Sequence, residues 1–470
     1  MKIIHVSAEC YPVAKVGGLA DVVGALPKYQ NNAGTTSQVV MPFYKNKFAQ
    51  EHRFKTLQEG SLKLGNDILD FKILIPENDD LGFELYLVDI PELLFTDYVY
   101  SKNDTDRFLA FQIAVLNWIL QNKEMPDVIH CHDHHAGLIP FMMSHVNKYK
   151  KLKNTPSVFT IHNAQYQGWF SHDKIDLIPE FPLSHIGLLD WDNCINPLAT
   201  AIKCAWRVTT VSPSYMEELK VKANGLESLI SSESQKCIGI LNGIDTKVWN
   251  PETDDLIQAK YGIANCDFGK QASKDWLCEK FALDPKKPLF VFIGRLVEEK
   301  AADLFYELFH LALKNLDISI LLLGTGDKTV EEQLTKLTSK YPKKYNAYIG
   351  YDEALSHKMY AGGDFLLMPS RVEPCGLNQM YSLRYGTIPI VNNIGGLKDT
   401  VVDISEGGFG FLHTENTVKG IFNSIKRATK YYNDSSKFKE TRKTIMQIDH
   451  SWDESAQQYI NLYKSLIQHS

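Results

Sequence analysis

A lysine, two adjacent glycines and an aspartate lie close together near the start of the chain, at Lys15, Gly17, Gly18 and Asp21. Paired glycines just before a helix let backbone N–H groups approach an anion closely, and the helix N-terminus adds positive potential. Lys15 would place a mobile positive charge at the same spot, so the segment predicts a phosphate site. Asp21 has two interpretations: it accepts hydrogen bonds from sugar hydroxyls, or it only complements the helix dipole. The glycines lack the G-x-G-x-x-G spacing of dinucleotide-binding loops.

A second charged loop contains Arg295 and Lys300, which follow a predicted strand and precede a predicted helix. Two cations that converge there suit a diphosphate whose negative charge grows as a bond breaks. The alternative is a solvated surface pair beside Glu298 and Glu299. Because a basic residue in the first turn of a helix opposes its dipole, a structural role is less natural for Lys300.

A third loop between a strand and a helix contains Glu373, followed by Cys375, Gly376 and Leu377. Glu373 could bind sugar hydroxyls while the backbone N–H groups behind it bind phosphate. The competing interpretation is an acidic residue that stabilises the start of a helix.

Four histidines and an aspartate occur in residues 130–135, whose sequence is HCHDHH and which follow a predicted strand. Such a cluster suggests a metal site. It nearly matches the H-x-H-x-D-H pattern of metallo-β-lactamase-type hydrolases, although His134 stands where the aspartate belongs. The alternative is a polar loop with one or two functional members. A further loop contains His162 and Asn163 before amide and aromatic side chains, groups that bond sugar hydroxyls and pack on pyranose rings.

The elements that position these loops are short apolar runs alternating with helical patterns, which signals parallel sheets with crossover helices. In the N-terminal part we expect a helix at about 19–30 and strands at residues 3–7, 39–41, 128–130, 158–161 and 208–211. In the C-terminal part we expect helices at 301–313, 330–339 and 377–385, and strands at 289–294, 318–324, 347–349, 364–368 and 388–391. A last helix is expected at about 453–466. Ligands of doubly wound sheets sit beyond the carboxyl ends of the strands, where the strand order reverses.

The length, charge and cysteine content of the chain limit the class of protein. A chain of 470 residues exceeds what one hydrophobic core usually supports, so we expect two domains, with the boundary near residues 242–251. The formal net charge of −6 argues against a nucleic-acid binder. Eight cysteines without C-x-x-C spacing indicate reduced thiols. The N-terminus lacks a signal-peptide pattern and the apolar runs are too short to span a bilayer, which predicts a cytoplasmic protein without a membrane partner.

Taken together, the loops resemble those of the bacterial-type glycogen and starch synthases over nearly the whole chain. Any one matching run is weak evidence, but six or more in the right order and spacing make a strong signal. The matching runs are residues 15–22, 130–138, 162–163, 241–245, 294–296 with Lys300, 369–386, 395–397 and 399–400.

The resemblance implies the GT-B fold, an α/β architecture of two doubly wound Rossmann-like domains that face each other across a cleft. It implies an N-terminal domain at residues 1–245 with the acceptor side and the glycine-rich loop. Residues 246–452 would form the nucleotide-sugar-binding domain, and residues 453–470 a helix that packs back on the N-terminal domain. Family members use ADP-glucose or UDP-glucose, extend an α-1,4-glucan acceptor, retain anomeric configuration and need no metal or other cofactor.

The resemblance also implies residue roles. Lys15, Arg295 and Lys300 should contact the diphosphate, while Asp21, His162 and Glu373 should contact the transferred glucose. Asp133 and Asn242 match family positions near the glucose and phosphates. The expected catalytic residues are His162, Glu373, Arg295, Lys300 and Asp133. The expected donor-binding residues are Lys15, Gly17, Gly18, Asp21, Asn163, Asn242, Arg295, Lys300, Cys375, Gly376 and Leu377.

Three positions depart from the family pattern. Ala301 stands where a glycine usually follows the lysine, and His134 stands where many members have tryptophan. Tyr381 replaces the second glutamate of the Glu-x7-Glu pattern of related GT-B enzymes, as it commonly does in the synthase branch.

The predicted function is transfer of glucose from ADP-glucose or UDP-glucose to the non-reducing end of an α-1,4-glucan, as a hexosyltransferase of the glycogen or starch synthase type. Resemblance favours ADP-glucose. Arg295 and Lys300 would stabilise the leaving diphosphate, a kind of contact often worth about 10²–10³ in rate. Three alternatives remain at this point: another GT-B glucosyltransferase such as a sucrose-synthase relative, a non-catalytic glucan-binding protein, and a metallohydrolase that uses the cluster from His130 to His135.

Overall fold

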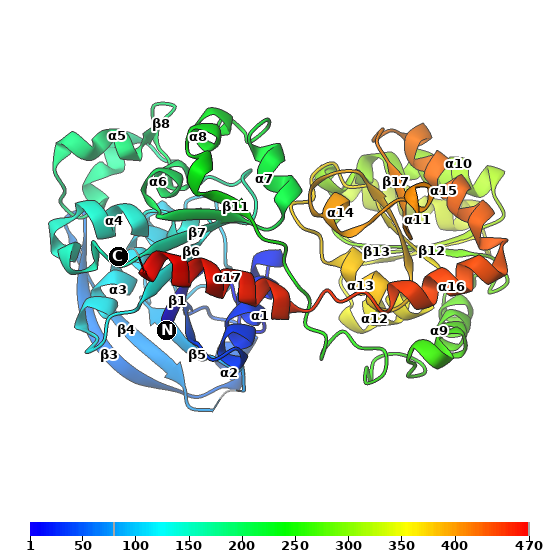
Figure 1. Ribbon diagram of the computed structural model, residues 1–470, viewed down its shortest axis with the longest axis horizontal. Coiled ribbons are helices and arrows are strands. Elements are labelled where there is room, and N and C mark those ends of the chain that lie inside the picture. The colour runs from blue at the N-terminus through cyan, green and yellow to red at the C-terminus, as the bar shows by residue number, and fades with distance from the viewer. Residues whose placement is uncertain (79, 469–470) are drawn as a thin grey trace. The chain divides into compact units, whose positions relative to one another are not determined.

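The structure is a computed structural model that describes residues 1–78 and 80–468, and the end of the expected C-terminal segment, residues 469–470, lies outside the described residues. The chain divides into two compact units (Figure 1). Unit 1 comprises Met1–Gly243 together with Trp452–Ser470, and unit 2 comprises Ile244–Ser451. The chain therefore passes between the units twice.

Unit 1 is built on a nine-stranded sheet with the order β11-β10-β7-β6-β1-β2-β5-β4-β3. Its strands are β1 (Lys2–Val6), β2 (Thr36–Pro42), β3 (Phe54–Leu64), β4 (Asp67–Pro76), β5 (Glu84–Asp89), β6 (Val128–His132), β7 (Ser157–Ile161), β10 (Arg207–Thr210) and β11 (Cys237–Gly239). The pairs from β11 to β5 are all parallel. From β1 the chain adds β2 and β5 on one side and then β6, β7, β10 and β11 on the other, so the strand order reverses between β1 and β6.

Helices connect these strands, and a small antiparallel hairpin is formed by β8 (Asp190–Trp191) and β9 (Cys194–Ile195). The helices are α1 (Gly18–Asn32), α2 (Lys47–Glu51), α3 (Thr105–Gln121), α4 (Ile139–His145), α5 (Ile186–Leu189), α6 (Pro197–Cys204), α7 (Pro213–Leu219), α8 (Glu227–Ser232) and α17 (Trp452–Ile467).

The last helix, α17, belongs to the core of unit 1 and packs beside α1 (Figure 1). Its apolar residues recur at three- and four-residue spacing, which places them on one face of the helix. Trp452, Tyr459 and Tyr463 on that face are buried against Ile3 of β1 and Val128 of β6. The C-terminal segment thus completes a core that the first residues of the chain begin.

The antiparallel edge of this sheet was absent from our sequence-based prediction. β4 pairs antiparallel with both β3 and β5, and Gly65, at φ +61°, lies in the turn between β3 and β4. A signal was present, since a Gly-Asn turn here separates two runs of alternating apolar and polar residues.

Unit 2 contains a six-stranded, all-parallel sheet with the order β14-β13-β12-β15-β16-β17. Its strands are β12 (Leu289–Ile293), β13 (Ser319–Gly324), β14 (Tyr345–Ile349), β15 (Phe365–Met368), β16 (Ile388–Asn392) and β17 (Phe411–His413). Its helices are α9 (Cys266–Lys280), α10 (Phe305–Asn315), α11 (Lys328–Lys340), α12 (Glu353–Gly362), α13 (Asn378–Arg384), α14 (Gly395–Thr400), α15 (Val418–Tyr432) and α16 (Ser435–Ile445). The strand order reverses between β12 and β15. The predicted α/β fold class of two doubly wound units is confirmed.

One expected helix begins later than predicted. Residues 301–313 were expected to be helical throughout, but α10 starts at Phe305, after short 3₁₀ turns at Glu298–Lys300 and Ala302–Leu304. The reason is Ala301, whose φ of +57° and ψ of +29° are left-handed and interrupt the helix. Among the described residues, no helix is both long and apolar enough to cross a membrane.

Candidate active site

Three loops with candidate residues leave adjacent strands of unit 1. β1, β6 and β7 are neighbours in the sheet and run parallel, so the loops that carry Lys15, Asp133 and His162 start from the same edge. The first two of these loops flank the reversal of strand order, where α/β sheets bind ligands. The structure therefore brings these candidates to the place that the fold favours for a site.

The glycine-rich loop is held by a carboxylate that sequence reasoning missed. Glu9, which is buried, accepts hydrogen bonds from the backbone N–H groups of Val16 at 2.5 Å and Gly17 at 2.9 Å. Its other oxygen accepts a hydrogen bond from the Tyr100 hydroxyl at 2.5 Å. One of the two glycine N–H groups that we expected to face an anion, that of Gly17, is thus already occupied. A carboxylate directly after β1 was the available signal. The anion-binding capacity of the loop begins at Gly18, the first residue of α1.

Neither glycine of the pair is required by the protein's own packing or backbone. A Cβ atom built on Gly17 or Gly18 meets no atom within 4 Å, and Gly17 has an ordinary extended backbone with φ −139°. The two glycines therefore border an open space that no described protein atom fills. Such open space beside a helix N-terminus is what close approach of a ligand requires.

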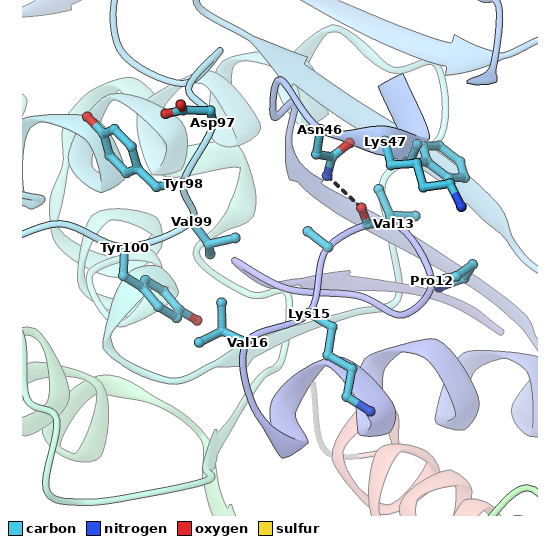
Figure 2. A pocket seen from close by; sticks show the side chains of 12 residues that line it. Pro12, Val13, Lys15, Val16, Asn46, Lys47, Asp97, Tyr98, Val99 and Tyr100 are labelled. Atoms are coloured by element: carbon cyan, nitrogen blue, oxygen red, sulfur yellow. Dashed lines mark hydrogen bonds between the residues drawn. The ribbon is translucent and has the colours of Figure 1, made fainter. Parts of the chain in front are cut away.

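Lys15 stands next to this space and pairs with Asp21, with Nζ 2.7 Å from the carboxylate oxygen. Both side chains are partly exposed. A hollow of about 500 Å³ lies beside the loop, and Lys15, Val16, Asn46 and Tyr100 are among the residues that line it (Figure 2). Asn46 anchors the other side of the loop by donating a hydrogen bond to the carbonyl oxygen of Val13 at 2.7 Å.

Asp133 and His162 are in direct contact at the ends of β6 and β7. The Asp133 carboxylate accepts a hydrogen bond from the backbone N–H of His162 at 2.8 Å. Asp133 adopts φ +56°, a strained conformation for a residue with a side chain. Desolvation raises the pKa of the Asp133 carboxyl to about 7, and burial lowers the pKa of His162 to about 3. Near neutral pH, His162 is therefore uncharged while Asp133 populates both forms.

Two asparagines of the expected donor site lie in unit 1. Asn242 is buried, and among the described residues no partner reaches its side-chain oxygen. A buried acceptor without a donor is costly, so this oxygen suits a ligand that supplies a hydroxyl. The side-chain oxygen of Asn163 accepts a hydrogen bond from the backbone N–H of Gln165 at 3.0 Å, which shapes the loop after β7.

The histidine-rich segment 130–135 is only partly a loop. β6 continues to His132, so His130 and His132 lie on one face of the strand beside His5 of β1. Among the described residues, the histidines close enough to share a metal are His5, His130 and His132, and all six of their ring nitrogens already have hydrogen-bond partners. The H-x-H-x-D-H interpretation also requires His135, which instead stacks on Tyr100 at 4.8 Å. The geometry does not favour the metallohydrolase alternative.

In unit 2 the second and third loops meet. The Lys300 ammonium lies 2.5 Å from the Glu373 carboxylate, although 73 positions separate the two residues. Lys300 follows β12 and Glu373 follows β15, so their contact spans the reversal of strand order in this sheet. Glu373 is buried and also accepts a hydrogen bond from the Ser370 hydroxyl at 2.9 Å. This ion pair therefore connects two loops that both contain candidate site residues.

Arg295 lies in the same loop as Lys300 but is more open to solvent. Its guanidinium is 3.2 Å from Glu299, and 58% of the side chain is exposed. The pairing with Glu299 matches the alternative of a solvated surface pair. Such an exposed ion pair adds little stability. The same exposure leaves Arg295 accessible to an anionic ligand. Lys300 pairs with Glu373 instead of with the neighbouring glutamates.

Cys375, Gly376 and Leu377 form the bend between Glu373 and α13. Gly376 has φ +74°, which favours glycine, and the carbonyl oxygens of Cys375 and Gly376 accept hydrogen bonds from the Gln379 side chain. Leu377 immediately precedes the first residue of α13 and has no side-chain cap. The bend presents backbone, and no acidic side chain, at the start of this helix.

The three departures from the family pattern also have structural consequences. Ala301, at the position where the resemblance leads us to expect glycine, has the left-handed conformation, at a cost of roughly 1–2 kcal/mol. The ring of His134 fills the space above Gly168, because a Cβ atom on Gly168 would lie 2.2 Å from it. Tyr381 stacks on Trp249 with ring centroids 3.8 Å apart.

Comparison with known proteins identifies the class. Residues 2–232 match the family described as starch synthase catalytic domain, and residues 274–444 match glycosyl transferases group 1. A glycogen synthase of Flavobacterium johnsoniae is 54% identical, with all of both chains covered. A glycogen synthase of Thermodesulfovibrio yellowstonii is 37% identical, with 99% of this chain and 98% of the relative covered.

Solved structures agree. The catalytic domain of starch synthase IV from Arabidopsis thaliana, bound to ADP and acarbose, superposes with a TM-score of 0.90 at 31% identity and covers 99% of each chain. A sucrose-phosphate synthase from Thermosynechococcus elongatus, at 16% identity and a TM-score of 0.64, shares the fold over 100% of this chain and 99% of its own. The two Rossmann-like units are those of the GT-B glycosyltransferases, enzymes that transfer hexoses. Within that class, the chain belongs to the glycogen and starch synthase family.

Proposed function

We propose that this protein transfers glucose from ADP-glucose to the non-reducing end of an α-1,4-glucan, with retention of configuration. The observation that carries the proposal is the Lys300–Glu373 contact at the reversal of strand order in unit 2, because it joins a cation suited to phosphate with a carboxylate suited to sugar hydroxyls. The curated relatives are named glycogen synthase, and the superposed starch synthase was solved with ADP, which supports ADP-glucose as the donor.

The proposed chemistry begins with charge separation. As the bond between glucose and the diphosphate breaks, negative charge grows on the diphosphate and positive charge on the sugar. Arg295 and Lys300 bind the diphosphate and stabilise its charge by preorganised electrostatics. Lys15 and the backbone N–H of Gly18 bind phosphate from the glycine-rich loop, and the missing side chain of Gly17 permits close approach. The bend from Cys375 to Leu377 supplies further backbone donors.

The proposed glucose site uses carboxylates and a histidine. Glu373 accepts hydrogen bonds from the sugar hydroxyls when Lys300 turns to the diphosphate, and Asp21 does so when Lys15 is engaged in the same way. Asp133 and the asparagines Asn163 and Asn242 complete the polar surface around the sugar and phosphates. Asn242 offers the buried oxygen that has no partner among the described residues.

The histidine acts as a binder of glucose and not as the proton-transfer group. An efficient general base has a pKa near the working pH, whereas burial lowers the pKa of His162 to about 3. We therefore propose that the departing phosphate accepts the proton of the acceptor hydroxyl on the same face of the sugar. This route retains configuration without a glycosyl-enzyme intermediate, in contrast to the two-carboxylate scheme of retaining glycosidases.

The test is direct. Purified protein is incubated with ADP-glucose or UDP-glucose and with glycogen, and nucleotide release is followed together with incorporation of labelled glucose. We expect release and incorporation in equal amounts, with ADP-glucose the better donor by kcat/KM. Preference for UDP-glucose would overturn the donor assignment, and release without incorporation would overturn transfer to glucan.

A further inference from the structure

A chain of hydrogen-bonded side chains crosses the interior of unit 1 and ends on His162. Gln30 Oε1 lies 2.8 Å from His5 Nε2, and His5 Nδ1 lies 3.0 Å from His132 Nε2. His132 Nδ1 then lies 3.0 Å from His162 Nε2. The four residues come from α1, β1, β6 and the loop after β7, so the chain links separate elements to one candidate sugar-binding residue.

The polarity of this chain is set at its buried end. A carbonyl oxygen only accepts hydrogen bonds, so His5 Nε2 carries the proton that bonds Gln30 Oε1. A neutral imidazole has one donor and one acceptor nitrogen, so His5 Nδ1 accepts from His132 Nε2–H. By the same reasoning His132 Nδ1 accepts from His162 Nε2–H. His162 is then protonated on Nε2, and its Nδ1 is an acceptor with no hydrogen-bond partner among the described residues.

The surroundings keep every ring in the chain neutral. His5 and His132 have no exposed surface, and burial lowers the pKa values of His5 to about 4 and of His132 well below its ordinary value. The Gln30 nitrogen also donates to the Tyr463 hydroxyl at 3.2 Å, and the Gln30 oxygen also accepts from the Ser37 hydroxyl at 2.7 Å. The direction of the chain therefore does not depend on solvent.

We propose that Gln30, His5 and His132 form a positioning relay that holds His162 as the Nε2–H tautomer and presents its Nδ1 as an acceptor for a sugar hydroxyl of the donor glucose. The inference rests on the proposed function for its substrate, but the tautomer of His162 is a property of the protein alone. His132 is the positioning residue, since it makes the one bond of the relay that reaches His162.

The tautomer is tested first, on the intact protein without substrate. Long-range proton–nitrogen correlation spectra of protein labelled with ¹⁵N-histidine distinguish protonated from unprotonated ring nitrogens, and the His162→Gln variant assigns the resonance. We expect a protonated Nε2 and an unprotonated Nδ1 for His162 at pH 7. The opposite tautomer, or a fast average of the two, would overturn the relay even if the enzyme transfers glucose normally.

The kinetic test compares three variants. His132→Leu removes the acceptor toward His162, whereas His132→Asn retains an oxygen near the position of Nδ1. His130→Leu is the matched control, because His130 stacks on His132 at 4.2 Å and is equally buried but bonds neither His132 nor His162; its partners are Tyr463 and Thr160. We expect His132→Leu to lower kcat about 5- to 10-fold, the effect of one hydrogen bond. His132→Asn should recover most of this loss, and His130→Leu should retain kcat.

The outcomes separate the relay from the proposed function. If the wild-type protein transfers no glucose, the proposed function fails and the spectra alone decide the tautomer. If it transfers glucose and His132→Leu retains kcat, or loses no more of it than His130→Leu, the positioning role is wrong. Should His132→Leu fail to fold, as shown by thermal unfolding, the wild-type spectrum and His132→Asn remain decisive.

Discussion

Lys15 and Lys300 share one arrangement, although they lie in different units. Each follows a strand at a reversal of strand order and is paired with a carboxylate that we propose as a sugar-binding group. In such a pair the cation holds the carboxylate in place, and the carboxylate keeps a long flexible side chain ordered. Each pair thus suits the ligand that we propose, which has phosphate at one end and hydroxyls at the other.

The Lys300→Ala variant should lower kcat with ADP-glucose by about 10²–10³, because it removes one preorganised cation from the leaving diphosphate. Lys328→Ala is a matched control: Lys328 also lies in unit 2 and pairs with a glutamate, Glu331, but 83% of its side chain is exposed. Steady-state kinetics with thermal unfolding as a folding check decide the matter. Near-normal turnover of Lys300→Ala would exclude the phosphate role.

The buried histidines predict a dependence of stability on pH. His5 and His162 have folded pKa values of about 4 and about 3, below the unfolded value of 6.5. Their contribution to stability is complete above pH 6.5 and is lost as the pH falls toward the folded values, by about 1.4 kcal/mol per pH unit for each histidine. Urea unfolding of unit 1 at pH 7, 6 and 5, followed by tryptophan fluorescence, should show this slope.

His162→Gln provides the comparison for that slope, since it removes one titrating group. Its free energy of unfolding should depend less steeply on pH than that of the wild type between pH 6 and 5. Parallel curves for the two proteins would mean that His162 titrates alike in the folded and unfolded chain.

Asp133 has the opposite sign, because its folded pKa of about 7 exceeds the ordinary 3.8, and its contribution to stability is lost as the pH rises through 7.

At the scale of elements, the parallel strands and the loops that leave them were predictable from the sequence. Apolar runs alternating with helical patterns located the strands before most candidate residues but missed β11, which precedes Asn242. The family resemblance named the residues. The carboxylate of Glu9 after β1 was a local signal for its bonds to Val16 and Gly17, but its bond to Tyr100 was not predictable, because Tyr100 lies 91 positions away. Such long-range partners leave no local pattern.

The prediction that residues 130–135 form a loop was wrong in part for a related reason. Its residues were treated as a loop, whereas β6 continues through His132 and alternation along the strand turns His130 and His132 to one face. Which side chains then meet depends on β1, 125 positions or more earlier in the chain, where His5 pairs with His130 in the sheet register. The spacing of the histidines suggested a metal site, whereas the neighbouring strands bring His5, His132 and His162 into a chain of hydrogen bonds.

The glycine pair allows a prediction at this scale. Gly17→Ala and Gly18→Ala should change the free energy of unfolding by less than about 1 kcal/mol, because an added Cβ meets nothing within 4 Å. Each should nevertheless raise the KM for ADP-glucose, since the methyl group occupies the space that we propose for the donor phosphates. Donor-dependent kinetics and thermal unfolding measure the two effects separately.

Gly24→Ala is the internal control for the same helix. A Cβ on Gly24 would lie 2.4 Å from the Tyr11 carbonyl oxygen, so this variant should destabilise the protein as well as disturb the loop. If Gly17→Ala and Gly18→Ala bound the donor as the wild type does, the glycine pair would have no role in ligand approach.

At the scale of the whole molecule, unit 1 is assembled from both ends of the chain. α17 buries Trp452, Tyr459 and Tyr463 in the core that α1 and β1 begin, and the Tyr463 hydroxyl bonds both Gln30 and His130. Each large apolar side chain removed from a core costs about 1.5–3 kcal/mol of burial. The sum for α17 is comparable with the entire stability of a typical domain.

A fragment of residues 1–243 should therefore fail to fold cooperatively. The matched fragment joins residues 1–243 to 452–468 through a short glycine–serine linker and should recover a sharp thermal transition. Circular dichroism and calorimetry of the two fragments measure this difference. A cooperative transition in the shorter fragment would show that α17 is dispensable for the fold of unit 1.

The second passage of the chain into unit 1 also fixes an order of events during synthesis. The segment that closes the core of unit 1 leaves the ribosome after all of unit 2 has been made. At roughly 5–20 residues per second, the N-terminal half waits on the order of ten seconds or more with its apolar surface uncovered. Unit 2 can complete its folding before unit 1 does. Chaperones that shield exposed apolar surface would therefore bind the incomplete unit 1, residues 1–243.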